Sequence, residues 1–489
     1  MTETALSIYC IAIGGTGMAP LACLLQELGH RVSGSDGPLY PPMSTLLAEA
    51  GIKPLVGFDP AHLDEVGPDL VIVGNAVPRS NPEALRAEEL RAEELRAEGG
   101  DAKEPRLELL SMPQAVARFL LAGRRPLVVA GTHGKTTTTA LAAWVWSATG
   151  RDPGYLIGGV PKNLPASFAL GGGDRFVIEG DEYNAAYFDR GAKFLHYQPQ
   201  TVILTSVEYD HADLYSSPEA LLEAYRRLVQ LVPPSGRLVA WGDSPEVRQV
   251  AAAARCPVIF YGFGEGNSVR VEGGAKGGEE SAGGSRFTVR DGEGEARELR
   301  LRVPGRHNVL NALAVWAAAR YDGLESSAVA EALAQFGGTA RRLEELGTAS
   351  GVTVVDDFAH HPTAVKASLE ALRGHYPGRR LVAIFEPRSL TAGRQMFYDA
   401  YRTSFGPADA VLFAPIFHAG RLEDAERLDL DSLVRDLRAA GSAAESCPTL
   451  DRLLERAIEV AQPGDVLVTM SSGGFGGMPR RLLDELGGE

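Results

Sequence analysis

The fold of this chain is decided by the stretch Leu127-Val-Val-Ala-Gly-Thr-His-Gly-Lys-Thr-Thr-Thr-Thr139. Leu127 to Ala130 is a short apolar run that predicts a buried strand, and the apolar pattern from Lys135 to about Thr149 predicts a helix that Gly150 ends. Gly131-Thr-His-Gly134 forms the tight turn between the two elements. Backbone N–H groups at the start of such a helix point toward bound anions, so this order of elements predicts a phosphate-binding loop.

The residues of this loop favour ATP. Lys135 supplies a positive charge for the phosphates, and the hydroxyl of Thr136 can bind Mg²⁺. The spacing differs from the full pattern GxxxxGK[ST], because Val129 stands where the first glycine is expected. An ordinary strand–turn–helix with a chance lysine is the alternative, but Gly-Lys-Thr stands where the strand passes into the helix. The residues predicted to contact the nucleotide are Gly131, Thr132, His133, Gly134, Lys135, Thr136 and Thr137.

Length and composition exclude several classes of protein. With 489 residues the chain has room for about three domains, and 45% hydrophobic with 23% charged residues is typical of a globular protein. A net charge of −15 argues against a nucleic-acid partner. The cysteines, at positions 10, 23, 256 and 447, are scattered, which favours a reducing compartment. No apolar run approaches the roughly 20 residues that cross a bilayer, so we expect a cytoplasmic protein without a membrane partner.

The beginning of the chain carries a second nucleotide-binding pattern. A strand is predicted at Ile8–Ile13, followed by Gly14-Gly-Thr-Gly-Met18, an apolar helix and a second strand that ends at Asp36. In a dinucleotide-binding fold such an acidic residue meets the ribose, which would indicate a dehydrogenase. However, Ala12 and Pro20 occupy two positions where the pattern GxGxxG requires glycine. We therefore predict a diphosphate held by backbone amides at the helix N-terminus. The candidate contacts are Gly14, Gly15, Thr16, Gly17 and Met18.

Two further features belong to this first domain. The predicted strand Leu70–Ala76 carries Asn75 at its C-terminal end, where it would reach the same sheet edge and the same ligand; a turn-forming role is the alternative. The segment Glu83–Glu98 repeats Leu-Arg-Ala-Glu-Glu, and a period of five gives no apolar stripe on a helix. We predict a solvent-exposed helical extension that carries no chemistry.

Two more strands are expected to end beside the phosphate loop. Phe176–Ile178 leads into Glu179, and Thr201–Thr205 leads into a segment that carries His211. Because the C-terminal ends of parallel strands face one crevice, these side chains should converge on the phosphates of ATP. A carboxylate and an imidazole there suit Mg²⁺, which neutralises charge as the γ-phosphoryl group leaves. A surface or capping role is the alternative for His211.

A helix that begins near Pro304 carries two asparagines. Asn308 and Asn311 lie about one turn apart on one face, and a side-chain amide offers both a donor and an acceptor to the edge of adenine. We predict that both residues bind the adenine of ATP. N-capping of the helix by Asn308 is the alternative.

The last part of the chain predicts a second α/β sheet. A flexible basic segment, Gly337–Arg342, precedes apolar runs that alternate with helical patterns. The predicted strand ends carry polar residues, namely Asp357, His360, His361, Arg388 and Arg394. Metal binding by His360 and His361 is one option, but adjacent side chains diverge on most backbones. We therefore expect contacts to substrate and nucleotide, and the arginines suit carboxylates because a guanidinium binds them through two nitrogens.

Four motifs occur in one order along the chain. They are Gly14-Gly-Thr-Gly-Met18, Gly131-Thr-His-Gly-Lys-Thr-Thr137, Gly305-Arg-His-Asn308 followed by Asn311, and Asp356-Asp357 followed by His360-His361-Pro362. In this combination the chain resembles the Mur ligase superfamily over nearly its whole length. Further motifs resemble the branch that joins a peptide to UDP-N-acetylmuramate, namely Tyr40-Pro-Pro-Met-Ser44, Glu179-Gly-Asp-Glu-Tyr183, Glu208-Tyr-Asp-His-Ala-Asp213, Phe385-Glu-Pro-Arg-Ser389 and Ser472-Gly-Gly-Phe-Gly-Gly477.

The resemblance implies an α/β chain of three domains. Residues 1–124 would form a Rossmann-like domain that binds the UDP sugar, and residues 125–338 a central P-loop ATPase-like domain. Residues 339–489 would form a C-terminal Rossmann-like α/β domain that binds the amine substrate and closes over ATP. The resemblance also implies an ADP-forming ligase that uses ATP and Mg²⁺. Its substrates would be UDP-N-acetylmuramate and the murein tripeptide L-alanyl-γ-D-glutamyl-meso-diaminopimelate, in peptidoglycan recycling. We expect a monomer.

Roles for individual residues follow from the same resemblance. It implies that the catalytic residues are Lys135, Glu179 and His211. Magnesium ions would be held by Thr136, Glu179 and His211, and Gly15 and Gly17 would approach the UDP diphosphate. Asn308 and Asn311 would hold adenine, Asp357 the ribose and Arg342 a phosphate. His360 and Arg388 would lie nearer the incoming peptide.

Two departures from the family pattern concern the nucleotide sites. Ala12 replaces the usual glycine, which would tighten the first loop. Several sister ligases use a carbamylated lysine as a further metal anchor after the DH motif, but the segment Phe194–Ala275 contains no lysine. That anchor is therefore not expected here.

The expected reaction begins when the muramate carboxylate attacks the γ-phosphorus of ATP and gives an acyl phosphate, which the free amine of the peptide then attacks. Lys135→Ala should abolish ligation and leave UDP-sugar binding intact. One alternative is a ligase that uses L-alanine as the amine, with the same chemistry. Another, from a different class, is a regulator that binds ATP and the UDP sugar without catalysis.

Overall fold

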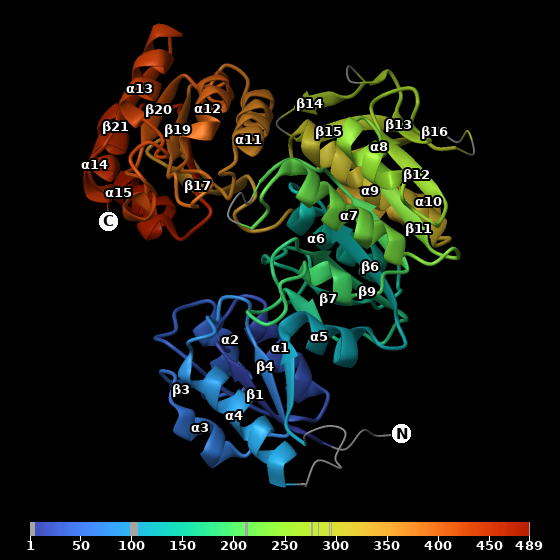
Figure 1. The fold of residues 1–489 in the computed structure, drawn as a ribbon. Coiled ribbons are helices and arrows are strands. Elements are labelled where there is room, and N and C mark those ends of the chain that lie inside the picture. The colour runs from blue at the N-terminus through green and yellow to red at the C-terminus, as the bar shows by residue number, and fades with distance from the viewer. Residues whose placement is uncertain are drawn as a thin grey trace.

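The computed structural model describes residues 5–97, 106–210, 214–274, 277–281, 283–292, 294 and 296–488, and these residues form three β-sheets. Figure 1 shows the first sheet and its helices at the bottom, the central sheet above it and the third sheet at the upper left. We call the three parts the first, central and third domains. Within the described ranges, no helix is both long and apolar enough to span a bilayer.

The first domain is a parallel sheet covered by helices on both faces. Its strand order is β3-β2-β1-β4-β5, with β1 (Ser7–Ile11), β2 (Arg31–Asp36), β3 (Leu55–Val56), β4 (Leu70–Val73) and β5 (Glu108–Ser111). One face packs against α1 (Met18–Glu27), α2 (Met43–Glu49) and α5 (Met112–Val116), and the other against α3 (Pro60–Val66) and α4 (Pro82–Ala97). Burial on both faces explains why β1 and β4 are continuous apolar runs.

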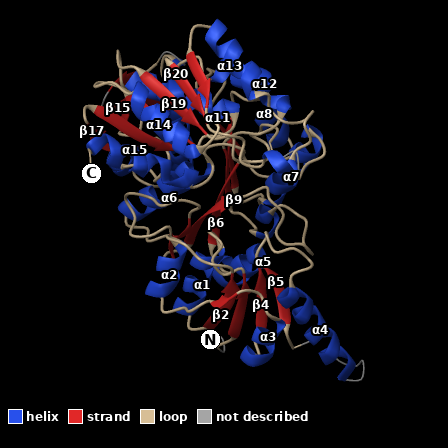
Figure 2. Cartoon of the chain, turned by 90° about the vertical axis from the view of Figure 1, so that its left-hand side faces the viewer, coloured by secondary structure: helices blue, strands red, loops and turns tan. Residues whose placement is uncertain are grey.

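Two sequence predictions in this domain can be compared with the structure. The helix is confirmed as α4, which projects from the domain in Figure 2, and residue 98 of the repeat lies outside the described residues. Its predicted solvent exposure is wrong for the first turns, because Ala84 and Ala87 are buried against the sheet. The first strand is shorter than predicted, because β1 ends at Ile11 and Ala12 has a φ of +63°. A left-handed residue cannot continue a strand.

The central domain has the largest sheet. Its order is β14-β15-β13-β12-β11-β10-β6-β9-β7-β8, and β16 pairs with β15. The strands are β6 (Arg125–Ala130), β7 (Gly154–Leu156), β8 (Phe168–Ala169), β9 (Arg175–Gly180), β10 (Thr201–Leu204), β11 (Arg237–Trp241), β12 (Val258–Gly262), β13 (Val269–Val271), β14 (Glu279–Ser281), β15 (Gly284–Arg290) and β16 (Ala296–Leu301). The run from β7 to β13 is parallel, so the C-terminal ends of β6, β9 and β10 meet at one edge.

The helices of the central domain cover both faces of its sheet. Alternate residues of β6 face opposite ways: Leu127 and Val129 pack with α6 (Lys135–Ala148), α9 (Arg306–Tyr321) and α10 (Ser326–Gln335), whereas Val128 and Ala130 pack on the side of α7 (Pro218–Leu231) and α8 (Pro245–Ala251). The phosphate-loop strand therefore lies in the middle of the core, and the loop that follows it is held on a rigid base.

The third domain confirms the predicted second α/β sheet. Its order is β17-β18-β22-β19-β20-β21, with β17 antiparallel to β18 and the other described pairs parallel. The strands are β17 (Glu344–Ala349), β18 (Val352–Asp357), β19 (Leu381–Phe385), β20 (Ala410–Phe413), β21 (Ala443–Ser446) and β22 (Val466–Met470). The helices are α11 (Pro362–His375), α12 (Tyr398–Ser404), α13 (Leu430–Ala439), α14 (Leu450–Val460) and α15 (Met478–Gly487).

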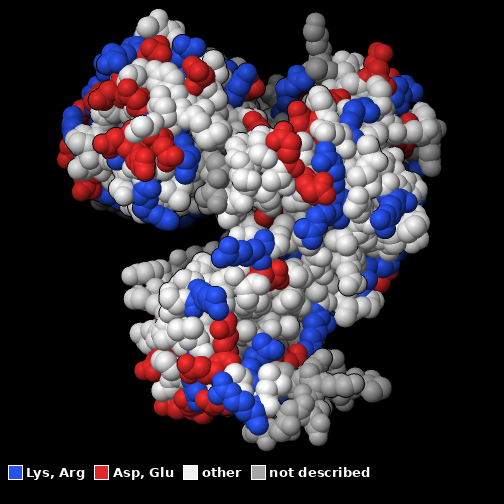
Figure 3. All heavy atoms as spheres, in the orientation of Figure 1, with Lys and Arg blue, Asp and Glu red and all other residues white. Residues whose placement is uncertain are grey.

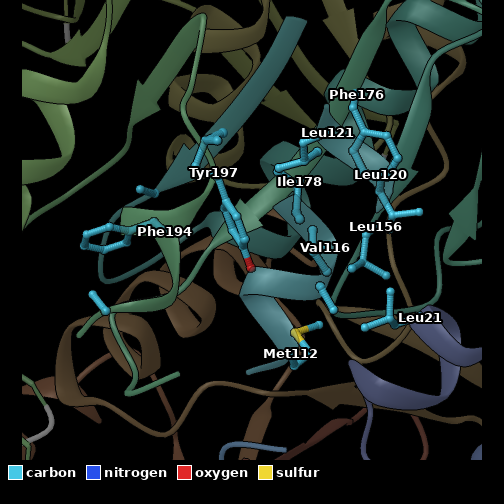
Figure 4. Close-up of a cluster of buried hydrophobic side chains, with 14 of the residues drawn as sticks. Leu21, Met112, Val116, Leu120, Leu121, Leu156, Phe176, Ile178, Phe194 and Tyr197 are labelled. Carbon is cyan, nitrogen blue, oxygen red and sulfur yellow. The ribbon is translucent and has the colours of Figure 1, made fainter. Parts of the chain in front are cut away.

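The two junctions between domains differ in character. Buried side chains of the first and central domains form one continuous apolar cluster, and Figure 4 shows part of it, including Leu21 of α1, Val116 of α5 and Leu156 of β7. Among the described residues, the buried apolar clusters of the third domain contain no side chain from the other two. The first and central domains are thus joined by a shared core. The contacts of the third domain with the central domain include hydrogen bonds, such as those of Thr363 with Glu208 and of Arg342 with Thr136.

Charged side chains of both signs lie on the face of the molecule that Figure 3 shows. Figure 3 shows positive and negative side chains interspersed on the visible face, and an open gap between the first and third domains.

Candidate active site

The phosphate loop has the predicted geometry. β6 ends at Ala130 and α6 begins at Lys135, and the intervening Gly131 and Gly134 have φ values of +134° and +82°. A Cβ atom at Gly131 would lie 2.2 Å from Thr205 Oγ1, and one at Gly134 would lie 2.9 Å from Asn311 Oδ1. Both positions therefore require glycine for backbone conformation and for space. The prediction of a strand, glycine turn and helix is confirmed.

Lys135 is held inside this loop by oxygen atoms. Its Nζ lies 2.7 Å from Gly131 O and 2.8 Å from Glu182 Oε2, just beyond the end of β9. Burial alone would lower the pKa of Lys135, but the Glu182 and Asp181 carboxylates outweigh it and raise the pKa. The ammonium group stays charged and in a fixed position. Glu182 belongs to a motif noted in the sequence, but its ion pair with Lys135 was not predicted.

The side chain of Thr136, the residue after Lys135, contacts that of Glu179 in β9. Thr136 Oγ1 donates to Glu179 Oε2 at 3.2 Å, and Gly158 N donates to Glu179 Oε1 at 2.6 Å. Burial and the nearby Asp181 raise the pKa of Glu179 to about 7. A hydroxyl and a carboxylate side by side are oxygen ligands of the type that Mg²⁺ prefers, so these two residues fit the predicted metal site. His211, the third predicted ligand, lies outside the described residues.

Arg342 reaches this site from the segment that leads into the third domain. Its Nη2 donates to Thr136 Oγ1 at 3.2 Å, and its guanidinium lies 4.5 Å from the ring centroid of Phe358. Burial lowers the pKa of Arg342, but an arginine remains charged at neutral pH. The structure therefore places a second cation beside Lys135, Thr136 and Glu179.

The two asparagines of α9 lie behind the loop. Asn311 Nδ2 donates to Asn308 Oδ1 at 3.2 Å, and Asn308 Nδ2 donates to Pro304 O at 2.6 Å. The N-capping alternative for Asn308 is wrong, because Gly305 is the N-cap residue and has no side chain. Asn311 packs against Gly134, so it also supports the shape of the loop.

The predicted polar residues of the third domain lie at the ends of its strands. Asp357, at the end of β18, accepts hydrogen bonds from Leu343 N, Ala359 N and Ser368 Oγ, and burial raises its pKa. His360 and His361 diverge as expected. The His360 ring lies edge-on to Phe358, whereas the His361 ring lies 5.0 Å from that of His133 in the phosphate loop.

Two predicted arginines follow the third-domain strands. Arg388, after β19, has its Cζ atom 3.9 Å from the ring centroid of Phe417 and its Nη1 3.5 Å from Glu386 Oε1. Arg394 pairs with Glu426 at 3.3 Å. Arg388 is therefore held in place by a stacked ring and a carboxylate.

The glycine loop of the first domain is closed by Asp36. The Asp36 carboxylate accepts from Gly14 N at 2.8 Å and from Gly37 N at 2.7 Å. In the structure this acid braces the loop, which argues against the ribose role that a dehydrogenase would need. A Cβ atom at Gly17 would lie 3.0 Å from Met112 Cε, so α1 starts close against α5.

The remaining first-domain candidates differ in exposure. Gly15, Thr16 and Asn75 are exposed at the C-terminal edge of the sheet, where a ligand can reach them. Met18 is buried at 3% exposure, and its Cε atom lies beside Gly74 under this edge. In the central domain, Thr137 is half-buried in the first turn of α6, and Thr132 Oγ1 donates to Glu208 O at 3.0 Å.

Sequence reasoning missed a cluster that joins the phosphate loop to the third domain. His133 Nε2 lies 2.9 Å from Glu208 Oε2, and His361 Nδ1 lies 3.9 Å from the same oxygen. Thr363 Oγ1 donates to Glu208 Oε1 at 2.7 Å. The signal in the sequence was that Glu208 comes after the predicted strand Thr201–Thr205, as Glu179 comes after the predicted strand Phe176–Ile178. In the structure Glu179 lies within β9, which extends to Gly180.

The chain matches known proteins along nearly its whole length. Three family models, described as Mur ligase family, catalytic domain, Mur ligase middle domain, and Mur ligase, glutamate ligase domain, match residues 7–99, 129–319 and 341–473. UDP-N-acetylmuramate–L-alanyl-γ-D-glutamyl-meso-2,6-diaminoheptandioate ligase of Escherichia coli K12 is 40% identical over 98% of each chain. UDP-N-acetylmuramate–L-alanine ligase of Burkholderia multivorans is 36% identical over 97% of each. The crystal structure of a murein peptide ligase from Psychrobacter arcticus has a TM-score of 0.70 and 33% identity, covering 99% of both chains.

Proposed function

The chain belongs to the Mur ligase family, and on that premise we propose that it joins UDP-N-acetylmuramate to L-alanyl-γ-D-glutamyl-meso-diaminopimelate at the expense of ATP. We choose the tripeptide as the amine substrate because the chain is 40% identical to a ligase named for this tripeptide. The 36% identity to an L-alanine ligase makes L-alanine the second candidate. Recycling of cell-wall peptide in the cytoplasm, by a monomer, is the setting that we propose.

The first step is transfer of the γ-phosphoryl group of ATP to the muramate carboxylate. Backbone amides at the start of α6 and the Lys135 ammonium would bind the phosphates, and Arg342 would add a second positive charge. These groups are already held by protein contacts, so little reorganisation is needed when charge develops. The product of this step is an acyl phosphate.

Magnesium would be held by Thr136 and Glu179, with His211 as a further ligand. It supplies positive charge that offsets the negative charge of the phosphates during transfer. The hydrogen bond between Thr136 and Glu179 and the backbone amide of Gly158 keep the two ligand oxygens in place.

The second step is attack of the free α-amine of the peptide on the acyl carbon, with loss of phosphate. We assign the peptide to the third domain, where Arg388 is fixed by Phe417 and Glu386 and would bind a carboxylate through two nitrogens. His360 would lie nearby. Approach of the third domain to the phosphate loop would also keep water from the acyl phosphate.

The first domain would hold the UDP sugar. The exposed residues Gly15 and Thr16 and the backbone at the start of α1 would meet the diphosphate, with Asn75 at the same edge. Adenine would lie near Asn308 and Asn311, and the ribose near Asp357.

The deciding experiment measures phosphate release from ATP and Mg²⁺ with UDP-N-acetylmuramate and either amine. We expect turnover with the tripeptide and little with L-alanine. The reverse result would identify an L-alanine ligase. Binding of ATP and the UDP sugar without phosphate release from either amine would identify a regulator without catalysis.

A further inference from the structure

Three side chains from distant parts of the chain converge at the junction between the central and third domains. They are His133 in the phosphate loop, Glu208 in the segment after β10, and His361 at the start of α11, and we call them the interdomain triad. One ligand atom from each residue can be chosen so that all three lie within 4.8 Å of one another. The Glu208 Oε2 atom is central, at 2.9 Å from His133 Nε2 and 3.9 Å from His361 Nδ1.

His133 and Glu208, the two central-domain members of the triad, are held in place by hydrogen bonds. Thr132 Oγ1 donates to Glu208 O at 3.0 Å and accepts from Glu208 N at 2.9 Å. His133 N donates to Ser206 Oγ at 2.9 Å. These hydrogen bonds fix the phosphate loop and the Glu208 segment to each other, so the imidazole and the carboxylate keep their relative position.

The third-domain half is positioned by the start of α11, where Thr363 N donates to His361 Nδ1 at 3.4 Å, a long hydrogen bond that a bound ion would replace. His361 is 4% exposed, and its ring packs edge-on to Phe397. Thr363 Oγ1 donates to the outer oxygen of Glu208, Oε1, at 2.7 Å, which leaves Oε2 facing both imidazoles. Hydrogen bonds of this type, which orient a ligating carboxylate, are common around metal ions in proteins.

From this arrangement we propose that His133, Glu208 and His361 form a binding site for a divalent transition-metal ion of the Zn²⁺ class. Two imidazole nitrogens and one carboxylate oxygen are a ligand set that suits Zn²⁺, Co²⁺ or Ni²⁺. The site proposed for magnesium, at Thr136 and Glu179, offers oxygen ligands instead. The two sites are therefore chemically distinct, although His133 and Thr136 belong to the same loop.

Metal binding at the triad would fix the position of the third domain. Two ligands belong to the central domain and one to the third, and the described residues show no buried apolar cluster that spans this junction. A bound ion would hold α11 against the phosphate loop. The position of the third domain would then depend on the metal.

The test uses Co²⁺ as a spectroscopic probe of the full-length protein after removal of metals with a chelator. The background variant is Glu179→Gln, which weakens the separate magnesium site. We expect one Co²⁺ per chain, with the intense visible absorption of a four-coordinate ion. His361→Asn, which can still cap α11, and Glu208→Gln should each weaken Co²⁺ binding at least tenfold. His360→Asn is the matched control, because His360 faces Phe358, and it should bind Co²⁺ as before.

The position of the third domain provides a second measurement. Small-angle X-ray scattering should show a narrower distribution of interatomic distances with Zn²⁺ than without it, and no such change in His361→Asn. The proposal is overturned if Co²⁺ gives no visible band in the Glu179→Gln background, or if His361→Asn binds Co²⁺ as tightly as the unchanged triad. Circular dichroism of each variant establishes that it is folded before binding is compared. If Glu208→Gln fails to fold, His133→Asn replaces it.

Discussion

The ammonium of Lys135 lies 2.8 Å from the carboxylate of Glu182, and the two side chains are 13% and 1% exposed. The lysine that the phosphate loop offers to a nucleotide is thus one half of a buried ion pair. Removing one partner of such a pair leaves an uncompensated charge in a medium that solvates it poorly. A substitution of Lys135 therefore affects folding as well as phosphate binding.

Lys135→Ala should abolish ligation and also lower the free energy of unfolding by about 3 kcal/mol. The double variant Lys135→Ala/Glu182→Gln should recover most of that stability, because the buried carboxylate is gone, and should remain inactive. Denaturant unfolding and phosphate release measured on both variants separate the two effects. Restored activity in the double variant would show that Lys135 has no role in phosphoryl transfer. Binding of UDP-N-acetylmuramate should be retained in both.

Metal binding beside the loop should depend on pH. Burial and Asp181 raise the pKa of Glu179 to about 7, so below pH 7 a proton occupies the carboxylate that the metal needs. The affinity of the nucleotide-free protein for Mn²⁺, used as a probe for Mg²⁺, should fall by up to about tenfold for each pH unit below 7 and level off above it. Electron paramagnetic resonance at pH 6 and pH 8 measures this. Glu179→Gln should lose the pH dependence, and equal affinities at the two pH values in the unchanged protein would contradict the assignment.

The parts of the site that could be predicted from sequence are those within one local element. Gly131, Gly134, Lys135 and Thr136 fall on a single strand–turn–helix, whose geometry follows from glycine conformation and helix N-terminal N–H groups. The position of Glu179 could also be predicted, because the C-terminal ends of parallel strands lie at one edge of a sheet.

The remaining contacts depend on how separate sheets pack. Lys135 and Glu182 are 47 residues apart, and Glu208 and Thr363 are 155 apart and belong to different domains. No periodicity or spacing along the chain encodes such distances. Asp36 could not be assigned from sequence for a different reason. An acidic residue after a strand can bind a ribose or stabilise its own loop, and the hydrogen bonds from Gly14 and Gly37 show the second role.

Ala12 should be a strained position. Its φ of +63° is in the left-handed region, which costs an ordinary residue about 1 kcal/mol relative to glycine. Ala12→Gly should therefore raise the free energy of unfolding by about 0.5–1 kcal/mol, as measured by urea denaturation. Gly29 provides the opposite control, because it has a φ of +94° and an added Cβ would meet no other heavy atom within 4 Å, so Gly29→Ala should destabilise by a similar amount. A loss of stability in Ala12→Gly would show that the left-handed conformation is not the source of strain.

The domains should unfold in two groups. The first and central domains share one buried cluster, and the described side chains of the third domain have clusters of their own. Differential scanning calorimetry should resolve a transition for the first two domains together and another for the third. Leu120→Ala, in the shared cluster, should move only the joint transition, with a loss of about 2–4 kcal/mol. Separate transitions for the first and central domains would be inconsistent with a cooperative shared core.

Arg388 should set the affinity for the peptide rather than for the nucleotide. Its guanidinium is confined between the Phe417 ring at 3.9 Å and Gly473, where a Cβ atom would lie 1.8 Å from Arg388 Nε. The proposed tripeptide carries free carboxylates, and a lysine in place of the arginine keeps the charge but loses the paired N–H donors. Arg388→Lys should therefore raise the KM for the tripeptide by about 10- to 100-fold and leave the KM for ATP and for UDP-N-acetylmuramate unchanged.

Gly473→Ala tests the same idea without altering the arginine. The added methyl group must displace Arg388 from its place on Phe417, so the KM for the tripeptide should rise while the net charge of the protein is constant. At Gly474, the next residue, an added Cβ would meet no other heavy atom within 4 Å, so Gly474→Ala is the matched control that should leave this KM near its original value. If Arg388→Lys and Gly473→Ala instead raise the KM for ATP, the arginine serves the nucleotide, and the peptide carboxylates must be bound elsewhere in the third domain.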